Sequence, residues 1–157
     1  MKLISLLEKL EYTCLQGSTD QEVKNAIYDS RKVEEGSLFI CIRGAVVDGH
    51  KFVPDVVAKG AKVLIVEEAV EAPEDVTVIL VKDTRYAMAF ISAAYFGYPA
   101  EKLKTIGITG TKGKTTTTYM VKSILENAGY KVGLIGTIEA IIGDKVIPAK
   151  NTTPESY

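Results

Sequence analysis

The sequence predicts a mixed α/β protein built from two successive parts. A small α/β domain is expected over residues 1–100, and residues 104–157 are expected to begin a second α/β domain. Short apolar runs alternate with segments whose apolar residues recur at helical spacing, which is the pattern of a layered α/β fold. Apolar residues make up 46% and charged residues 25% of the 157-residue chain. This composition is typical of a globular protein with a hydrophobic core, and it excludes a disordered or fibrous chain.

In the first part, strands and helices are predicted in alternation. The leucines at positions 3, 6, 7 and 10 indicate an amphipathic helix at the amino terminus. Strands are predicted at 37–42, 62–66 and 77–81 because these runs are apolar and β-branched. A helix around 52–59 holds Pro54, which is tolerated only in a first turn. Asp83 or Thr84 can cap a helix whose core face is Ala87, Met88, Ile91, Ala94 and Tyr95.

In the second part, the pattern predicts a strand, a glycine-rich turn, a helix and a second strand. The strands are expected at 105–109 and 131–135, so that the three elements form a β-α-β unit. The helix between them places Met120, Val121, Ile124, Leu125 and Ala128 on its apolar face, and Gly129 follows its end. Residues 138–142 and 145–147 flank Gly143-Asp144 and predict a β-hairpin. We expect residues 104–157 to form only the first part of a nucleotide-binding domain.

The net charge, the cysteines and the lengths of the apolar runs indicate which classes of protein this chain does not resemble. Nineteen basic and twenty acidic residues leave a net charge of −1, so the chain as a whole has no electrostatic attraction for nucleic acid or an anionic membrane. Cys14 and Cys41 show no metal-binding or redox spacing and are expected to be reduced. No apolar run approaches the ~18 residues of a membrane span. We expect a soluble, cytoplasmic protein.

The segment from Gly107 to Thr116 is the strongest chemical signal in the sequence. Its glycines allow backbone N–H groups to point inward at phosphate oxygens, and the helix that follows directs its positive end to the same place. Lys114 can reach the β- and γ-phosphates, Thr115 can coordinate Mg²⁺, and Thr116 can contact the α-phosphate. Ile108 stands where a strict phosphate-loop pattern has glycine. The structural alternative is a surface turn rich in glycine and lysine. The expected nucleotide-binding residues are Gly110, Thr111, Lys112, Gly113, Lys114, Thr115 and Thr116.

This loop resembles the ATP loop of the Mur ligases and folylpolyglutamate synthetases. Upstream, several short motifs are similar to the amino-terminal domain of the Mur ligases that add the third residue or the terminal dipeptide: Asp29-Ser30-Arg31, 36–39, Gly44, Asp48-Gly49-His50 and Gly60-Ala61. Downstream, Gly136-Thr137 and residues 151–156 are similar to the type that adds the third residue. The resemblance covers nearly the whole chain and implies a P-loop ATPase domain from residue 104.

The resemblance implies an ATP-dependent amide ligase of peptidoglycan precursor synthesis. In that family ATP and Mg²⁺ activate the carboxylate of UDP-N-acetylmuramoyl-L-alanyl-D-glutamate as an acyl phosphate, which the amine of a diamino acid then attacks. Either meso-diaminopimelate or L-lysine is the diamino acid. Lys114 and Thr115 would serve in catalysis, and the remaining catalytic residues of the family lie beyond Tyr157. The 157 residues are therefore expected to be inactive alone, and the protein to be a monomer.

The resemblance also implies substrate-binding residues outside the loop. Two groups are expected near the uridine nucleotide and near the γ-phosphate: Tyr28, Ser30, Ala45, Val46 and Val47 in the first, and Asn151, Thr152 and Thr153 in the second. On the residues alone, Asp29-Ser30 could equally cap a turn, and 151–154 could be a polar loop. His50, the single histidine, is expected to start a helix rather than to bind a metal.

Two other function classes stay open at this point. One is a nucleotide-binding module that binds UDP-sugar or ATP without turnover. The other is a different P-loop enzyme, such as a kinase or the dipeptide-adding ligase. The threonine run 115–118 and the segment 151–154 disfavour the second class.

Overall fold

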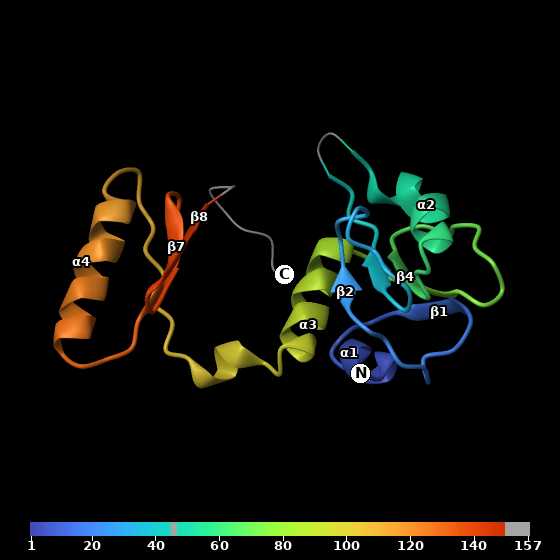
Figure 1. The fold of residues 1–157 in the computed structure, drawn as a ribbon, viewed down its shortest axis with the longest axis horizontal. Coiled ribbons are helices and arrows are strands. Elements are labelled where there is room, and N and C mark those ends of the chain that lie inside the picture. Colours follow the sequence, from blue (N-terminus) through green and yellow to red (C-terminus); the bar gives the residue numbers. More distant parts are fainter. Residues whose placement is uncertain (45–46, 150–157) are drawn as a thin grey trace. The chain divides into compact units, whose positions relative to one another are not determined.

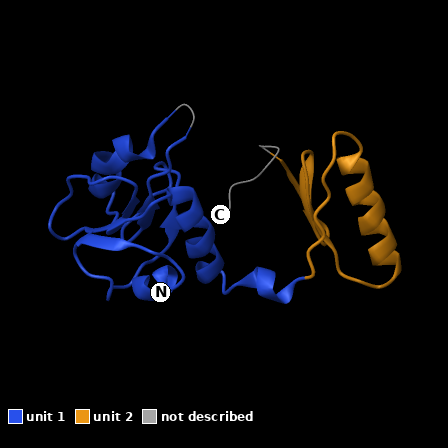
Figure 2. Cartoon of the chain, turned by 180° about the vertical axis from the view of Figure 1, so that it is seen from behind, with its two compact units in different colours: residues 1–103, 156–157 blue, residues 104–155 orange. Residues whose placement is uncertain are grey.

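The computed structural model describes residues 1–44 and 47–149. The chain divides into two compact units, and the boundary lies between Leu103 and Lys104 (Figure 2). The first unit holds all elements up to η2, and the second holds α4 and the strands that follow it (Figure 1). The structure is mixed α/β, as the sequence predicts.

The first unit is built on a five-stranded sheet with the order β1-β5-β4-β3-β2. The strands are β1 (Thr13–Gln16), β2 (Ala26–Ile27), β3 (Leu38–Ile40), β4 (Val63–Val66) and β5 (Thr77–Leu80). Strands β2 to β5 run parallel, and β1 pairs antiparallel with β5 at one edge. The prediction of a partly parallel sheet is confirmed. The short strands β1 and β2 were not predicted.

Helices cover both faces of this sheet. Helices α1 (Leu3–Leu7) and α3 (Thr84–Tyr95) pack with Leu38 and Ile40 on one face. On the other face, α2 (Val53–Ala58) packs with Phe39 and Cys41. Successive side chains of a strand point to opposite faces, so β3 and β4 are buried throughout, as expected for parallel strands between two layers. Pro54 lies in the first turn of α2, as predicted.

Capping residues begin the helices that lead away from the sheet. Asp83 caps α3 and accepts hydrogen bonds from the N–H groups of Arg85 and Tyr86 at 2.8 and 2.9 Å. The short 3₁₀ helix η1 (Gly49–Phe52) precedes α2 and is capped by Asp48. A second 3₁₀ helix, η2 (Pro99–Lys102), leads to the boundary between the units.

The second unit contains α4 (Lys114–Asn127) and a three-stranded antiparallel sheet of β6 (Gly133–Ile135), β7 (Glu139–Ile142) and β8 (Lys145–Pro148). The predicted helix and hairpin are confirmed. The predicted strand at 105–109 is wrong, and so is the β-α-β unit. Residues 105–109 pair with no strand among the described residues, and β6 instead pairs antiparallel with β7. Because a strand exists only through its ladder of hydrogen bonds, an apolar run without a neighbour is left outside the sheet.

The second unit has a much smaller interior than the first. Leu134 is the only buried residue among the described residues of this unit. The predicted apolar face of α4 is half-buried at Val121 and Leu125, but Met120 and Ile124 are 61% and 67% exposed. The hydroxyl of Tyr119 donates a hydrogen bond to Glu139 and joins α4 to β7. In the part of the chain that the structure describes, no helix is both long and apolar enough to cross a membrane.

Candidate functional site

Several polar residues of the first unit directly follow the carboxyl ends of its parallel strands. Tyr28 to Ser30 follow β2, Arg43 follows β3 and Glu67 follows β4. Ligands of open α/β sheets bind outside the carboxyl ends of the strands, where the loops converge. The predicted uridine-nucleotide residues that the structure describes therefore lie in the region where such a sheet binds ligands.

The turn after β2 is held by Asp29. Its carboxylate accepts hydrogen bonds from the Arg31 guanidinium, 2.8 Å from Nε and 2.7 Å from Nη2, and from the Arg31 backbone N–H at 3.1 Å. These contacts lower the pKa of Asp29 to about 2. Asp29 therefore caps the turn, which is the structural alternative considered for Asp29-Ser30 in the sequence. The hydroxyl of Ser30 makes no hydrogen bond within the described residues, and Tyr28 is 39% exposed.

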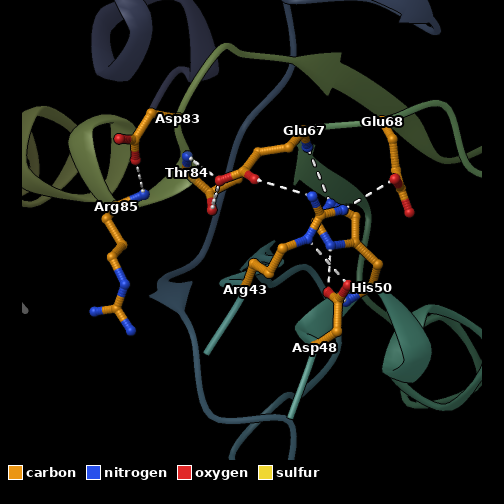
Figure 3. Close-up of polar contacts among 8 residues, drawn as sticks. All are labelled: Arg43, Asp48, His50, Glu67, Glu68, Asp83, Thr84 and Arg85. Carbon is orange, nitrogen blue, oxygen red and sulfur yellow. Dashed lines mark hydrogen bonds and ion pairs between the residues drawn. The ribbon is translucent and has the colours of Figure 1, made fainter. Parts of the chain in front are cut away.

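A network of charged side chains connects the segments after β3 and β4 (Figure 3). The guanidinium of Arg43 lies 3.1 Å from Asp48 Oδ2 and 2.9 Å from Glu68 Oε2. Its Nη1 is 3.9 Å from Glu67 Oε2. Between Arg43 and Asp48, the N–H of Gly44 donates to the carbonyl of Val47 at 2.9 Å. The described ends of this loop are therefore fixed by side chains and by backbone.

His50 lies in the first turn of η1, as predicted, and its buried ring uses both nitrogens. Nδ1 lies 2.6 Å from Asp48 Oδ1, and Nε2 accepts the backbone N–H of Glu67 at 3.0 Å. Because Nε2 accepts, the proton of the neutral ring resides on Nδ1. Ligand atoms of Asp48, His50 and Glu68 all lie within 4.8 Å of one another, but Arg43 pairs with both carboxylates and no imidazole nitrogen is free. The cluster is an ion-pair network rather than a metal centre.

We expect Asp48 to make the stability of the first unit dependent on pH. Hydrogen bonds from the backbone and ring of His50 lower the pKa of Asp48 to about 2. A lowered folded-state pKa means that the stabilisation is present above the ordinary value near 4 and is lost as the pH falls through about 2. Urea unfolding between pH 6 and 2 should show this loss, and Asp48→Asn should flatten the curve. An identical curve for Asp48→Asn and the loop control Glu74→Gln would contradict the expectation.

In the second unit, the glycine-rich loop turns into the amino terminus of α4. Gly113 precedes the helix with φ of 78°, and Gly110 has φ of 147°, conformations that favour glycine. Lys114, the first helical residue, donates from Nζ to the carbonyl of Gly110 at 2.6 Å. The first N–H groups of a helix have no partner within it, so they can bind an anion. The loop is exposed, including Thr111 and Lys112.

The four threonines of α4 differ in what their hydroxyls contact. Thr117 donates to the carbonyl of Gly113 at 2.9 Å, and Thr118 donates to that of Thr115 at 2.6 Å. Within the described residues the hydroxyls of Thr115 and Thr116 make no hydrogen bond. Thr115 is half-buried at the start of α4, and its hydroxyl oxygen suits Mg²⁺, which prefers oxygen ligands beside phosphates. Thr115 and Thr116 are thus the two hydroxyls available for the predicted roles.

Some predicted residues lie outside the described part of the chain: Ala45, Val46, Asn151, Thr152 and Thr153. The neighbouring Val47 is described and is 49% exposed. Conversely, the sequence analysis missed Arg43, Glu67 and Glu68. The available signal was their position, because charged residues directly after two buried strands lie at the ligand-binding edge of a parallel sheet.

Comparisons with known proteins match both units. Residues 22–96 match the family model described as "Mur ligase family, catalytic domain", and residues 108–157 match the "Mur ligase middle domain". The chain belongs to the Mur ligase family. It is 54% identical over its whole length to the UDP-N-acetylmuramoyl-L-alanyl-D-glutamate–2,6-diaminopimelate ligase of Clostridium perfringens and covers 32% of that protein. The ligase of the same name from Clostridium tetani is 49% identical over 99% of the chain, which covers 33% of that relative.

This Mur ligase chain therefore spans about a third of the length of the curated relatives it matches. Among solved structures, a crystal structure of MurF from Acinetobacter baumannii matches with a TM-score of 0.64 and 35% identity, over 80% of this chain and 27% of that one. A UDP-N-acetylmuramoyl-L-alanyl-D-glutamate–2,6-diaminopimelate ligase structure matches 96% of this chain and 30% of its own with a TM-score of 0.71. At 22% identity that likeness concerns the fold.

Proposed function

We propose that this Mur ligase chain contributes the UDP-sugar-peptide site and the ATP loop of the ligase that adds the third peptide residue to UDP-N-acetylmuramoyl-L-alanyl-D-glutamate. The observation that carries the proposal is the 54% identity, over all 157 residues, to a relative named for this reaction. The names of the relatives favour 2,6-diaminopimelate over L-lysine as the amino acid added.

The proposed chemistry begins with activation of a carboxylate. A carboxylate oxygen of the substrate attacks the γ-phosphorus of ATP, ADP leaves, and an acyl phosphate forms. The amine of the diamino acid then attacks the acyl carbon, phosphate leaves and the nitrogen loses a proton. Lys114 and the amino terminus of α4 would hold the phosphates and offset the charge that accumulates during transfer. Thr115 would hold Mg²⁺, whose positive charge would help to offset that of the phosphates.

The carboxyl edge of the first sheet is the proposed site for the uridine-nucleotide end. The hydroxyl of Ser30 is available there, Tyr28 lies two residues before it, and Val47 is exposed after β3. Hydroxyl donors suit the polar edge of a uracil ring, and an aromatic ring can stack on its face. Asn151, Thr152 and Thr153 remain predicted contacts near the γ-phosphate. The proposed cellular location is the cytoplasm.

A second candidate is the dipeptide-adding ligase. The MurF structure from Acinetobacter baumannii is 35% identical over 80% of the chain, so the chain is similar to ligases of more than one type. The two functions differ in substrate, because the dipeptide-adding enzyme acts on a nucleotide that already carries a tripeptide. Preferential binding of that longer nucleotide would favour this alternative.

Calorimetric titration of the chain tests the proposal. We expect saturable binding of UDP-N-acetylmuramoyl-L-alanyl-D-glutamate, with UDP as the reference ligand. Ser30→Ala should weaken this binding by about three- to tenfold, the effect of losing one hydrogen bond. Ser5→Ala, on the exposed surface of α1, is the matched control and should bind like the unaltered chain. The absence of binding by a folded chain would contradict the proposal.

A further inference from the structure

The segment that follows α3 begins with a fixed turn. Gly97 has φ of 71° and Tyr98 has φ of 53°. The N–H of Gly97 donates to the carbonyl of Ala94 at 3.1 Å, and the N–H of Tyr98 donates to the carbonyl of Ala93 at 2.7 Å. Together these two bonds form a Schellman motif, which ends a helix and satisfies its last carbonyl groups. Gly97 therefore belongs to the end of α3, although a glycine before a tyrosine and a proline could be taken for a hinge.

The side chain of Tyr98 is tied to the end of α1. Its hydroxyl donates a hydrogen bond to Glu8 Oε1 at 2.7 Å. The ammonium group of Lys9 lies 3.9 Å from the centre of the Tyr98 ring, where the negative face of the ring attracts a cation. The same ammonium group lies 3.2 Å from Glu101 Oε1 in η2. Because the leucines of α1 are buried in the core beside α3, these contacts connect η2 to a fixed part of the first unit.

The 3₁₀ helix η2 has no hydrophobic anchor of its own. All of its residues, Pro99–Lys102, are exposed. Within residues 1–44 and 47–149, Tyr98 is the only residue other than glycine with a positive φ. A side chain with a Cβ disfavours this conformation, so neighbouring contacts have to hold it. The contacts of Tyr98 with Glu8 and Lys9 meet this requirement.

We propose that Tyr98, Glu8 and Lys9 form a clamp that makes η2 a rigid extension of the first unit, so that the flexible joint of the chain between the two units begins after Leu103. This property does not depend on which substrate or nucleotide the chain binds. Each contact is exposed and weak alone, but all of them restrict the same few side chains. A joint that begins after Leu103 is shorter than one that begins at Gly97, and a shorter joint has fewer conformations.

Two variants of Tyr98, studied in the whole chain by nitrogen-15 relaxation and amide hydrogen exchange, test the clamp. Tyr98→Phe removes only the hydrogen bond to Glu8. Tyr98→Asn removes the ring as well and keeps the turn, because asparagine tolerates the left-handed conformation. The matched control is Tyr130→Phe, which removes the hydroxyl of an exposed tyrosine in the second unit.

The clamp predicts a sharp change of mobility at the boundary. In the unaltered chain, we expect order parameters of about 0.85 at Glu101, as in α3, and of about 0.6 or less at Thr105. The Glu101 amide bonds to the carbonyl of Tyr98 at 3.1 Å, and its exchange reports the opening of η2. This exchange should accelerate by about three- to tenfold in Tyr98→Phe, as for loss of one hydrogen bond, and by more in Tyr98→Asn. Tyr130→Phe should leave it unchanged.

Three results would overturn the clamp. The first is an order parameter at Glu101 of the unaltered chain as low as that at Thr105. The second is equal exchange of the Glu101 amide in Tyr98→Asn and Tyr130→Phe. The third is an equal acceleration of the β4 amides in Tyr98→Asn, which would indicate a general loss of stability. Faster exchange at Glu101 with unchanged exchange in β4 would support the clamp.

Discussion

Replacing Lys114 with alanine should weaken ATP binding to this chain by about tenfold to a hundredfold. Lys114 is the first residue of α4, and its ammonium group donates to the Gly110 carbonyl at 2.6 Å. A charged hydrogen bond to a phosphate contributes about 1.5–3 kcal/mol, which corresponds to that loss in affinity. Calorimetric titration with ATP and Mg²⁺ measures the effect.

Lys145→Ala is the matched control for this prediction. Lys145 is an exposed lysine of β8 in the same unit, so its removal changes the net charge equally without altering the loop. Thr115→Val offers an independent check, because it should reduce the dependence of ATP affinity on Mg²⁺ while Lys114 is kept. Equal ATP affinities of Lys114→Ala and Lys145→Ala would show that the loop does not hold the phosphates through this lysine.

The fold of the first unit could be predicted because its strands are buried on both faces. The run Val63–Val66 is apolar throughout, which is typical of a parallel strand between two helical layers. Strand β2 could not be found in this way, because it has two residues and gains its identity from pairing with β3. Strand β1 lies at the edge with mostly exposed residues, so its sequence lacks the apolar signal.

In the second unit, the sequence predicts a strand that the structure does not contain. Residues 105–109 have the composition of a strand, but composition describes only the preference of a segment. Pairing decides whether a strand forms, and β6 finds its partner in the adjacent hairpin, across a short connection. The amphipathic pattern of α4 likewise predicts a helix correctly without predicting how much of its face is buried.

The two candidate sites differ in how far apart their residues lie in the sequence. The ATP loop is local, since its glycines, lysine and threonines lie within ten residues and their spacing implies their chemistry. The network at the carboxyl edge joins residues 43, 48, 50, 67 and 84, which come together only when the strands pair. This network could therefore not be predicted from the spacing of its residues in the sequence.

Gly49→Ala should destabilise the first unit by about 1–3 kcal/mol, the usual cost of overpacking a close contact. Gly49 is buried, and a Cβ at this position would stand 2.7 Å from the backbone nitrogen of Ile42 and 2.8 Å from its oxygen. A backbone cannot move aside as a side chain can, so the strain would open the loop that Arg43 and Asp48 close. The melting temperature should fall by on the order of 5–20 °C for a domain of this size.

Gly97→Ala is the control for Gly49→Ala, because it adds a Cβ at a glycine that has a positive φ but no close contact. Gly97 has φ of 71°, but a Cβ there would meet nothing within 4 Å, so alanine costs only the left-handed strain of about 1–2 kcal/mol. Gly49→Ala should additionally accelerate exchange of the Gly44 amide, which Gly97→Ala should leave protected. If the two variants have the same stability and the same exchange rate of the Gly44 amide, the close approach at Gly49 does not hold the loop. If they differ as expected, the glycine between Asp48 and His50 is required for its close approach to the backbone of Ile42, just after β3.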